Sequence, residues 1–63
     1  MEIYYEIDDP DSSTRSVRDK EVAEFYFHQG YFVNEVKLAT IYHNHSVVRT
    51  IVTTPIVDDS YFQ

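Results

Sequence analysis

The chain has 63 residues, of which 43% are hydrophobic and 16% aromatic, and its formal net charge is −6. This composition is too apolar for a disordered chain, and the length allows one domain with a marginal core. The acidic balance argues against direct binding to nucleic acid or to an anionic membrane, and the absence of cysteine excludes disulfides and thiolate metal sites. We therefore expect a small protein that gains stability by forming a homodimer.

Residues 2–8 alternate between apolar and polar side chains, which predicts a half-buried strand. Its apolar face carries Ile3, Tyr5 and Ile7. Its solvent face carries Glu2, Tyr4, Glu6 and Asp8. Residues 9–14 are rich in Asp and Ser and include Pro10, so they predict a loop.

A helix between Ser16 and Gly30 is predicted by signals at both ends. Ser16 can cap the first turn, with Asp19 three residues later, and Gly30 can adopt the left-handed conformation that ends a helix. The apolar arc of this helix spans about 200°, which is wider than one sheet surface covers. Either a second body covers its C-terminal half, around Phe25 and Phe27, or one of its aromatic side chains stays exposed.

Residues 31–43 alternate again and predict a long strand. The better core face of this strand consists of Phe32, Val36, Leu38, Thr40 and Tyr42. The following Asn44-His45 pair suits a hairpin turn of two residues, because Asn tolerates positive φ. Residues 46–54 are rich in β-branched side chains, as expected of an interior strand, and Pro55 should end its pairing.

The hairpin turn also predicts a register, in which four pairs face each other across the two strands. These are Tyr42 with Val47, Thr40 with Arg49, Leu38 with Ile51, and Val36 with Thr53.

The predicted fold class is therefore α+β, a single βαββ domain over residues 1–55 followed by a C-terminal arm or tail at 56–63. Its sheet has three strands, mixed or antiparallel, with one helix on one face. The favoured spatial order is 2-3-1, with the β-branched strand in the middle, and the alternative is 1-2-3.

The sheet face away from the helix should keep apolar residues exposed and so favour a homodimer. We expect this face to carry Tyr4, Val33, Ile41, Val48 and Val52. The predicted dimer contacts are Phe25, Phe27, Ile41, Val48 and Val52.

Candidate catalytic chemistry is sparse. His43 and His45 flank the predicted turn, and a metal there would need a third ligand such as His28 or a carboxylate. Ser46 has no oxyanion-forming loop beside it. We expect no enzyme activity, no resident metal and no cofactor, and a metal-binding protein that uses these histidines remains a minor alternative.

An acidic surface is the main functional candidate. Six residues of the first strand and loop form the expected partner-binding set: Glu2, Tyr4, Glu6, Asp8, Asp9 and Asp11. Carboxylates two residues apart on a strand are about 6.6 Å apart, close to two nucleotide rises along DNA, so the surface can act as a nucleic-acid mimic.

The leading functional prediction is a cytoplasmic regulatory or inhibitory protein, of the type that phages and mobile elements encode, that binds a basic protein surface. We expect no secretion signal and no membrane-spanning segment. The alternative is an assembly module that forms a homo-oligomer through its exposed sheet face.

Overall fold

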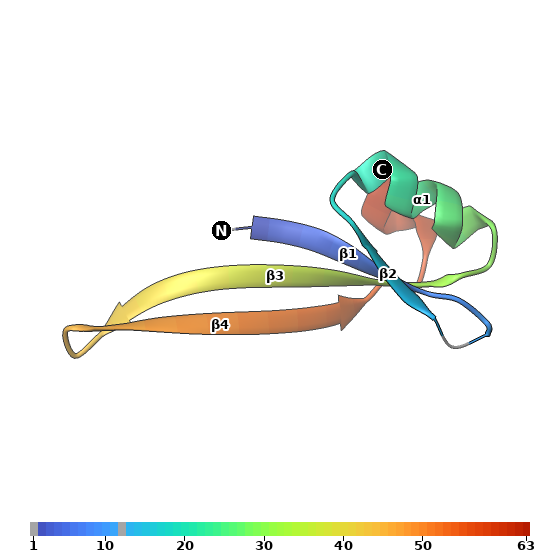
Figure 1. Cartoon of the computed structure of the whole chain (residues 1–63). Helices are drawn as coiled ribbons and strands as arrows, with labels where there is room; N and C mark the ends of the chain where they lie inside the picture. Colours follow the sequence, from blue (N-terminus) through green and yellow to red (C-terminus); the bar gives the residue numbers. More distant parts are fainter. Residues whose placement is uncertain (1, 12) are drawn as a thin grey trace.

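The computed structural model describes residues 2–11 and 13–63; Met1, and Ser12 of the expected loop, lie outside them. The elements are β1 (Glu2–Asp8), β2 (Thr14–Val17), α1 (Lys20–His28), β3 (Phe32–His43), β4 (Ser46–Pro55) and a 3-10 turn, η1 (Asp59–Phe62). The strands form one antiparallel sheet in the order β2-β1-β3-β4, with α1 over one end of it (Figure 1).

The α+β class with one helix is confirmed, but the prediction of three strands is wrong, because the sheet has four. The additional strand, β2, lies in the segment predicted as loop and helix start. It reverses the chain before the helix, so α1 connects β2 to β3, and β1 pairs antiparallel with both of these strands. The favoured strand order 2-3-1 is therefore wrong. The alternative order 1-2-3 has the right neighbours, because β1, β3 and β4 lie in that order. It requires parallel first strands, however, and β1 and β3 are antiparallel because β2 reverses the chain between them.

The helix begins later than predicted because Asp19, not Ser16, is its cap. Ser16 lies in β2, paired with Glu6, whereas the Asp19 carboxylate accepts a hydrogen bond from the backbone N–H of Glu21 at 2.9 Å. The predicted stop is confirmed, because Gly30 has φ +94°, a conformation that side chains with a Cβ rarely adopt.

The hairpin turn is also confirmed: Asn44 and His45 have φ of 49° and 64°, the positive values that a type I′ turn requires. The register between β3 and β4 is the predicted one at all four pairs. However, β4 is an edge strand and not an interior one. Its β-branched residues indicate a strand, but they do not distinguish an edge from the middle of a sheet.

The core lies between α1 and the sheet, on what we call the helix face. It consists of Tyr5, Ile7, Ala23, Val33 and Ile56. The predicted core face of β3 is therefore wrong: Val33 is 2% exposed, whereas Phe32 is 78% exposed. Only Val36 of that predicted set is fully buried, on the opposite, open face, between its strand partners Tyr4 and Thr53. Tyr4 therefore does not share a face with Val33.

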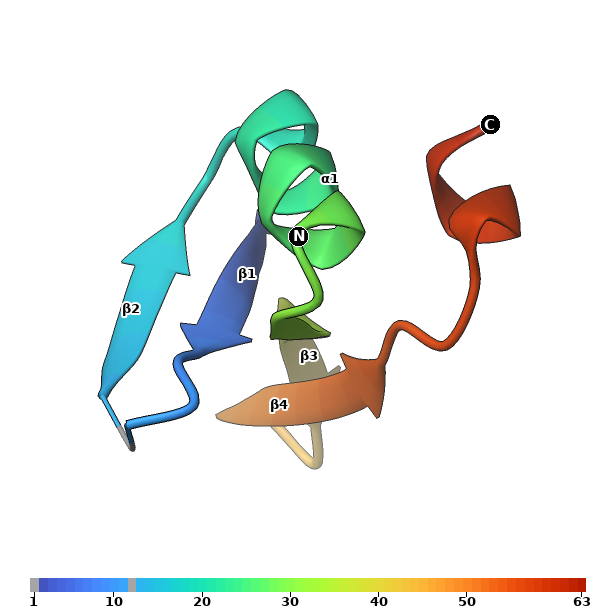
Figure 2. The same cartoon turned by 90° about the vertical axis from the view of Figure 1, so that its right-hand side faces the viewer.

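The C-terminal residues 56–63 pack on their own chain beside α1 (Figure 2). The backbone N–H of Ile56 donates to the Val33 carbonyl at 2.9 Å, and the Phe62 ring lies 5.6 Å from that of Phe27. This segment thus covers one of the three consecutive aromatic residues of the helix. Phe25 remains 59% exposed.

Beyond the pairing of Glu2 with Leu38, the β3–β4 hairpin continues without β1. We call this projecting part, residues 39–50, the arm. It extends away from α1 and gives the molecule its elongated dimensions of 45 × 28 × 17 Å (Figure 1). No helix in the described part of the chain has the length and apolar character to cross a membrane.

Candidate protein-interaction site

The acidic residues predicted to bind a partner follow one strand and the loop after it. Glu2, Glu6 and Asp8 occupy alternate positions of β1 together with Tyr4, and all four lie on the open face, away from α1. Asp9 and Asp11 continue them in the loop. We call the five carboxylates, at positions 2, 6, 8, 9 and 11, the acidic strip.

Hydrogen bonds hold the loop end of the acidic strip in place. The Asp8 carboxylate accepts from the Thr14 hydroxyl at 3.0 Å, and Asp9 accepts from the backbone N–H of Asp11 at 3.4 Å. A carboxylate oxygen of Asp9 also lies 4.0 Å from the guanidinium of Arg15, and the Arg15 side chain is half exposed. Among the described residues, the other members of the strip form no ion pair, so their charge is available to a partner.

Two further acidic residues, Asp58 and Asp59, do not join the strip. Asp58 accepts hydrogen bonds from the hydroxyl of Ser60 and from its backbone N–H, the latter at 2.9 Å. The bond from the hydroxyl, followed by the one from the N–H, lowers the pKa of the Asp58 carboxyl group. Asp59 lies 2.6 Å from His28 at the end of α1. Asp58 therefore caps η1, and Asp59 links the C-terminal segment to the helix.

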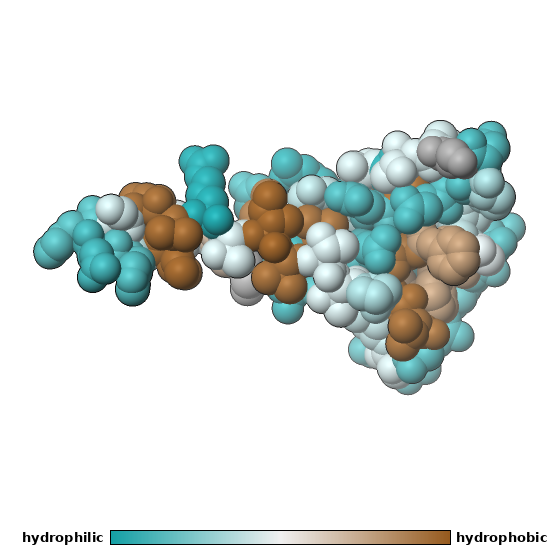
Figure 3. Space-filling view, turned by 90° about the horizontal axis from the view of Figure 1, so that it is seen from below, coloured by the Kyte–Doolittle hydropathy of each residue, from teal (hydrophilic) through white to brown (hydrophobic). Residues whose placement is uncertain are grey.

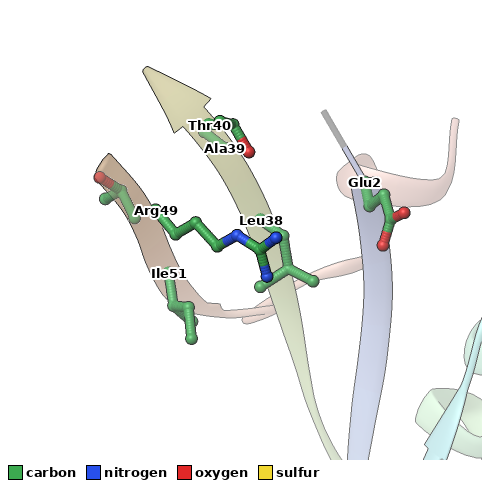
Figure 4. Close-up of a pocket in the computed structure, with 7 residues that line it drawn as sticks. Glu2, Leu38, Ala39, Thr40, Arg49 and Ile51 are labelled. Carbon is green, nitrogen blue, oxygen red and sulfur yellow. The ribbon is translucent and has the colours of Figure 1, made fainter. Parts of the chain in front are cut away.

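An open hollow of about 460 Å³ lies at the other end of the strip, on the open face (Figure 4). Leu38 and Ile51 supply apolar surface, and Glu2 and Arg49 stand on its two sides. The Arg49 side chain runs from β4 across Leu38 toward β1, where Glu2 is placed (Figure 4). The hollow thus combines an apolar surface with one charge of each sign.

Exposed apolar side chains cover the open face of the hairpin, which sequence reasoning had assigned to the core beneath the helix. Ile51 is 66% exposed, Val47 57% and Tyr42 80%. Figure 3 looks at the molecule from below in Figure 1, where apolar patches along the hairpin alternate with polar ones. The alternation of β3 separates its two faces, but it identifies the exposed one only when the face that packs against the helix is known.

The residues predicted to form the dimer are only partly together. Ile41, Val48 and Val52 do share the helix face of the hairpin, beyond the reach of α1, and each is 41–50% exposed. Phe25 lies on the helix instead, and Phe27 is largely covered by Phe62 within the same chain. The arm therefore exposes apolar side chains on both of its faces: Ile41 and Val48 on one, Tyr42 and Val47 on the other.

A buried polar cluster that the sequence analysis did not single out lies beneath the C-terminal segment. Glu35 is 8% exposed. It accepts a hydrogen bond from the Tyr61 hydroxyl, and Lys37 lies 3.5 Å from its other oxygen. Tyr5 and Tyr61 join their hydroxyls at 3.0 Å. Burial, followed by the bond to Glu35, raises the pKa of Tyr61 well above its usual range.

The histidines do not converge. His43 and His45 lie at the tip of the hairpin, whereas His28 lies in α1 at the other end of the molecule (Figure 1). Within residues 2–11 and 13–63 there is no group of three or more metal-ligating side chains arranged to hold an ion.

The fold and these surfaces define a small α+β protein with an acidic strand and a projecting apolar hairpin. Comparisons with protein-family models, with curated proteins and with solved structures found no match to the chain.

Proposed function

We propose that this chain is a small non-catalytic protein that binds a basic surface of a protein partner through the acidic strip. It acts as a regulator or inhibitor, of the type that phages and mobile elements encode. Because it has no cysteine to oxidise, we assign it to the cytoplasm.

The observation that carries this proposal is the alignment of carboxylates on one face of one strand. Glu6 and Asp8 are consecutive open-face positions of β1, so their Cα atoms are about 6.6 Å apart. Two nucleotides of one DNA strand advance about 6.8 Å along the helix axis. A basic groove that accepts a nucleic-acid backbone would therefore meet charges at a spacing close to that of its usual ligand. We accordingly include nucleic-acid-binding proteins among the expected partners of the strip.

The distribution of charge along the sequence supports the same proposal. All 11 Asp and Glu residues lie outside residues 36–57, where the only formal charges are Lys37 and Arg49. The negative potential is thus concentrated at the end of the molecule that holds the strip. Such a field speeds association with a positive partner and makes binding depend on ionic strength.

The test compares charge reversals on and off the strip. Glu6→Lys and Asp8→Lys should abolish the capture of basic proteins from a host lysate, and raised salt should do the same to the unmodified chain. Glu24→Lys is the matched control, since it makes the same change in net charge on α1, on the other side of the sheet. Equal capture by all three variants would contradict the proposal.

A second candidate function, an assembly module, is favoured by the exposed arm. Val48 and Val52 are 41% and 49% exposed on the same face of β4. If the protein acts by forming an oligomer, Val48→Lys or Val52→Lys should produce monomers, as measured by light scattering, while Glu6→Lys leaves the oligomer intact. Monomers at every concentration of the unmodified chain would rule this function out.

A further inference from the structure

The strand β4 lies at the edge of the sheet and has one free backbone edge. Ile56 donates its N–H to Val33 on β3. In an antiparallel pair, hydrogen-bonded and non-hydrogen-bonded residues alternate. The even-numbered residues of β4 therefore direct their N–H and C=O groups toward β3, and the odd-numbered ones direct theirs toward the free edge. The outward residues are Val47, Arg49, Ile51, Thr53 and Pro55.

This edge lacks the features that usually prevent strands from pairing with other molecules. Sheet edges are normally short or interrupted by charges, proline or bulges. The opposite edge, β2, has 4 residues, whereas β4 has 10. Pro55 stands only at the end of β4, and the single charged side chain, Arg49, runs across β3 and away from the free edge (Figure 4).

The arm also lacks the strands that it needs for stability. A two-stranded ribbon is marginally stable in water, and three or more strands with a packed apolar face are usually required. Residues 39–50 have only each other as strand partners within the described chain, and they expose apolar side chains on both faces. A further strand along β4 would supply the missing support.

The charge distribution selects the occupant. A second copy of the chain carries the same net charge of −6, so most of its surface would be repelled. Residues 36–57 have no acidic side chain and are the exception. The β4 edge of one copy can therefore approach the β4 edge of another without the repulsion that the rest of the surface generates.

We propose that β4 pairs antiparallel with β4 of a second copy about a two-fold axis at Thr50. This inference rests on the second candidate function, the assembly module, and places its interface at the β4 edge. The axis at Thr50 joins outward residues to outward residues and avoids placing Arg49 opposite itself. The facing pairs are Thr50 with Thr50, Arg49 with Ile51, Val48 with Val52, and Val47 with Thr53.

Three of these four pairs favour the contact. Thr–Thr pairs and β-branched pairs stabilise neighbouring antiparallel strands, and Val48 and Val52 are both about half exposed in the single chain. Because the strands run in opposite directions, the tip of each arm lies beside the base of the other hairpin. That base carries Val57, which is 82% exposed.

The pairing also arranges the acidic strips. Both open faces lie on the same side of the joined sheet, and five strand spacings of about 4.8 Å separate the two copies of β1. The strips would thus lie on one surface, about 24 Å apart across the strands. They would also be offset by about 26 Å along the strands, because the middle of β1 is level with Thr54, four residues from the axis. One dimer would present an acidic strip at each end of one surface, with the paired arms between them.

Single-cysteine variants test the register directly, because the chain has no cysteine of its own. Facing residues at the axis are about 4.5 Å apart at Cα, within the range of a disulfide. Under mild oxidation Thr50→Cys should therefore form a covalent dimer rapidly. Ile51→Cys, with a diagonal separation of about 7–8 Å, should do so much more slowly. Faster crosslinking of Ile51→Cys would overturn the register.

Proline at an outward position tests the edge itself. Ile51→Pro removes an N–H that faces away from β3, so the hairpin keeps its own hydrogen bonds, as it does at Pro55. Ile51→Ala loses the same side chain but keeps the N–H. Relative to Ile51→Ala, Ile51→Pro should weaken the dimer about tenfold or more, because each dimer loses two hydrogen bonds. Far-ultraviolet circular dichroism checks that both variants fold.

The outcomes separate the edge from the other proposals. Dimers of equal strength in Ile51→Pro and Ile51→Ala would overturn the edge pairing while leaving an assembly function through the sheet face. Monomers at every concentration of the unmodified chain would overturn both. Neither result affects the acidic strip, whose binding to basic proteins is measured separately with Glu6→Lys.

Discussion

The hydroxyl of Tyr61 should be a principal source of stability, and Tyr61→Phe isolates it. The substitution keeps the ring, which packs edge-on against Tyr5 with centroids 6.2 Å apart, and removes only the oxygen. Glu35 then keeps Lys37 on one carboxylate oxygen but loses the donor on the other. Because Glu35 is 8% exposed, water cannot fully replace that donor.

The expected loss follows from these contacts. A hydrogen bond to a charged group contributes about 1.5–3 kcal/mol, and a bond between neutral groups about 0.5–1.5 kcal/mol. The single proton of Tyr61 is used on Glu35, so Tyr5 is the donor in the bond between the two hydroxyls. Tyr61→Phe should therefore cost more than Tyr5→Phe, which leaves the bond to Glu35 intact.

Urea and thermal unfolding, followed by circular dichroism, measure the difference. Each kcal/mol should lower Tm by about 4–8 °C in a domain of this size. Tyr4→Phe is the matched control, since Tyr4 lies on the open face and its hydroxyl has no partner among the described residues; it should stay within about 0.5 kcal/mol of the unmodified chain. A Tyr61→Phe variant as stable as Tyr4→Phe, or more stable than Tyr5→Phe, would refute the reasoning.

Three further predictions concern the same fold. Because the pKa of Tyr61 is raised in the folded chain, its phenol ionises at lower pH in the unfolded chain. The free energy of unfolding should therefore fall as pH rises above about 10, and it should fall less steeply in Tyr61→Phe. Urea unfolding at a series of alkaline pH values measures this. Asp19→Ala should cost about 0.5–2 kcal/mol in urea unfolding, because the N–H of Glu21 loses its acceptor. Gly30→Ala should cost about 1–2 kcal/mol by the same assay, because φ is +94° with open space around it, so the loss is conformational and not steric.

The parts of the fold that the sequence predicted well are those set by local chemistry. Asn44 determines the hairpin turn, and the turn determines the whole register of β3 with β4, since no residue can be inserted without turning every side chain to the other face. Gly30 ends the helix for an equally local reason. The alternation of β1 placed its acidic residues together on one face, and the structure has them there.

The missed strand explains most of the errors. β2 is the segment Thr-Arg-Ser-Val, with Val17 as its one apolar residue, so no alternation distinguishes it from a loop. If β2 is not recognised, the chain passes straight from β1 into the helix. A β-α-β connection of that kind makes β1 and β3 parallel when they are neighbours, whereas the reversal at β2 makes them antiparallel. The choice of strand neighbours, and with it the place where the helix lands, depended on this short strand.

The core face of β3 was undecidable from its own residues for a related reason. Val33 lies on one face and Val36 on the other, and both are buried. An alternating strand whose two faces are both apolar does not indicate which one takes the helix. That choice is made by β2 and α1, which place Ala23 over Val33.

The same ambiguity has a functional meaning. A strand that is buried on one face only can carry polar residues on the other face. The strands β3 and β4 nevertheless carry apolar residues on both faces, well beyond the reach of α1. The described residues of a single chain offer these side chains no core to enter, and the acidic residues that would keep such a surface soluble are all placed elsewhere. Selection for solubility alone would have distributed charge along the arm. An edge strand without acidic side chains, apolar side chains on both faces and a separate acidic strand thus support the two contacts proposed above, one made by the arm and one made by the strip.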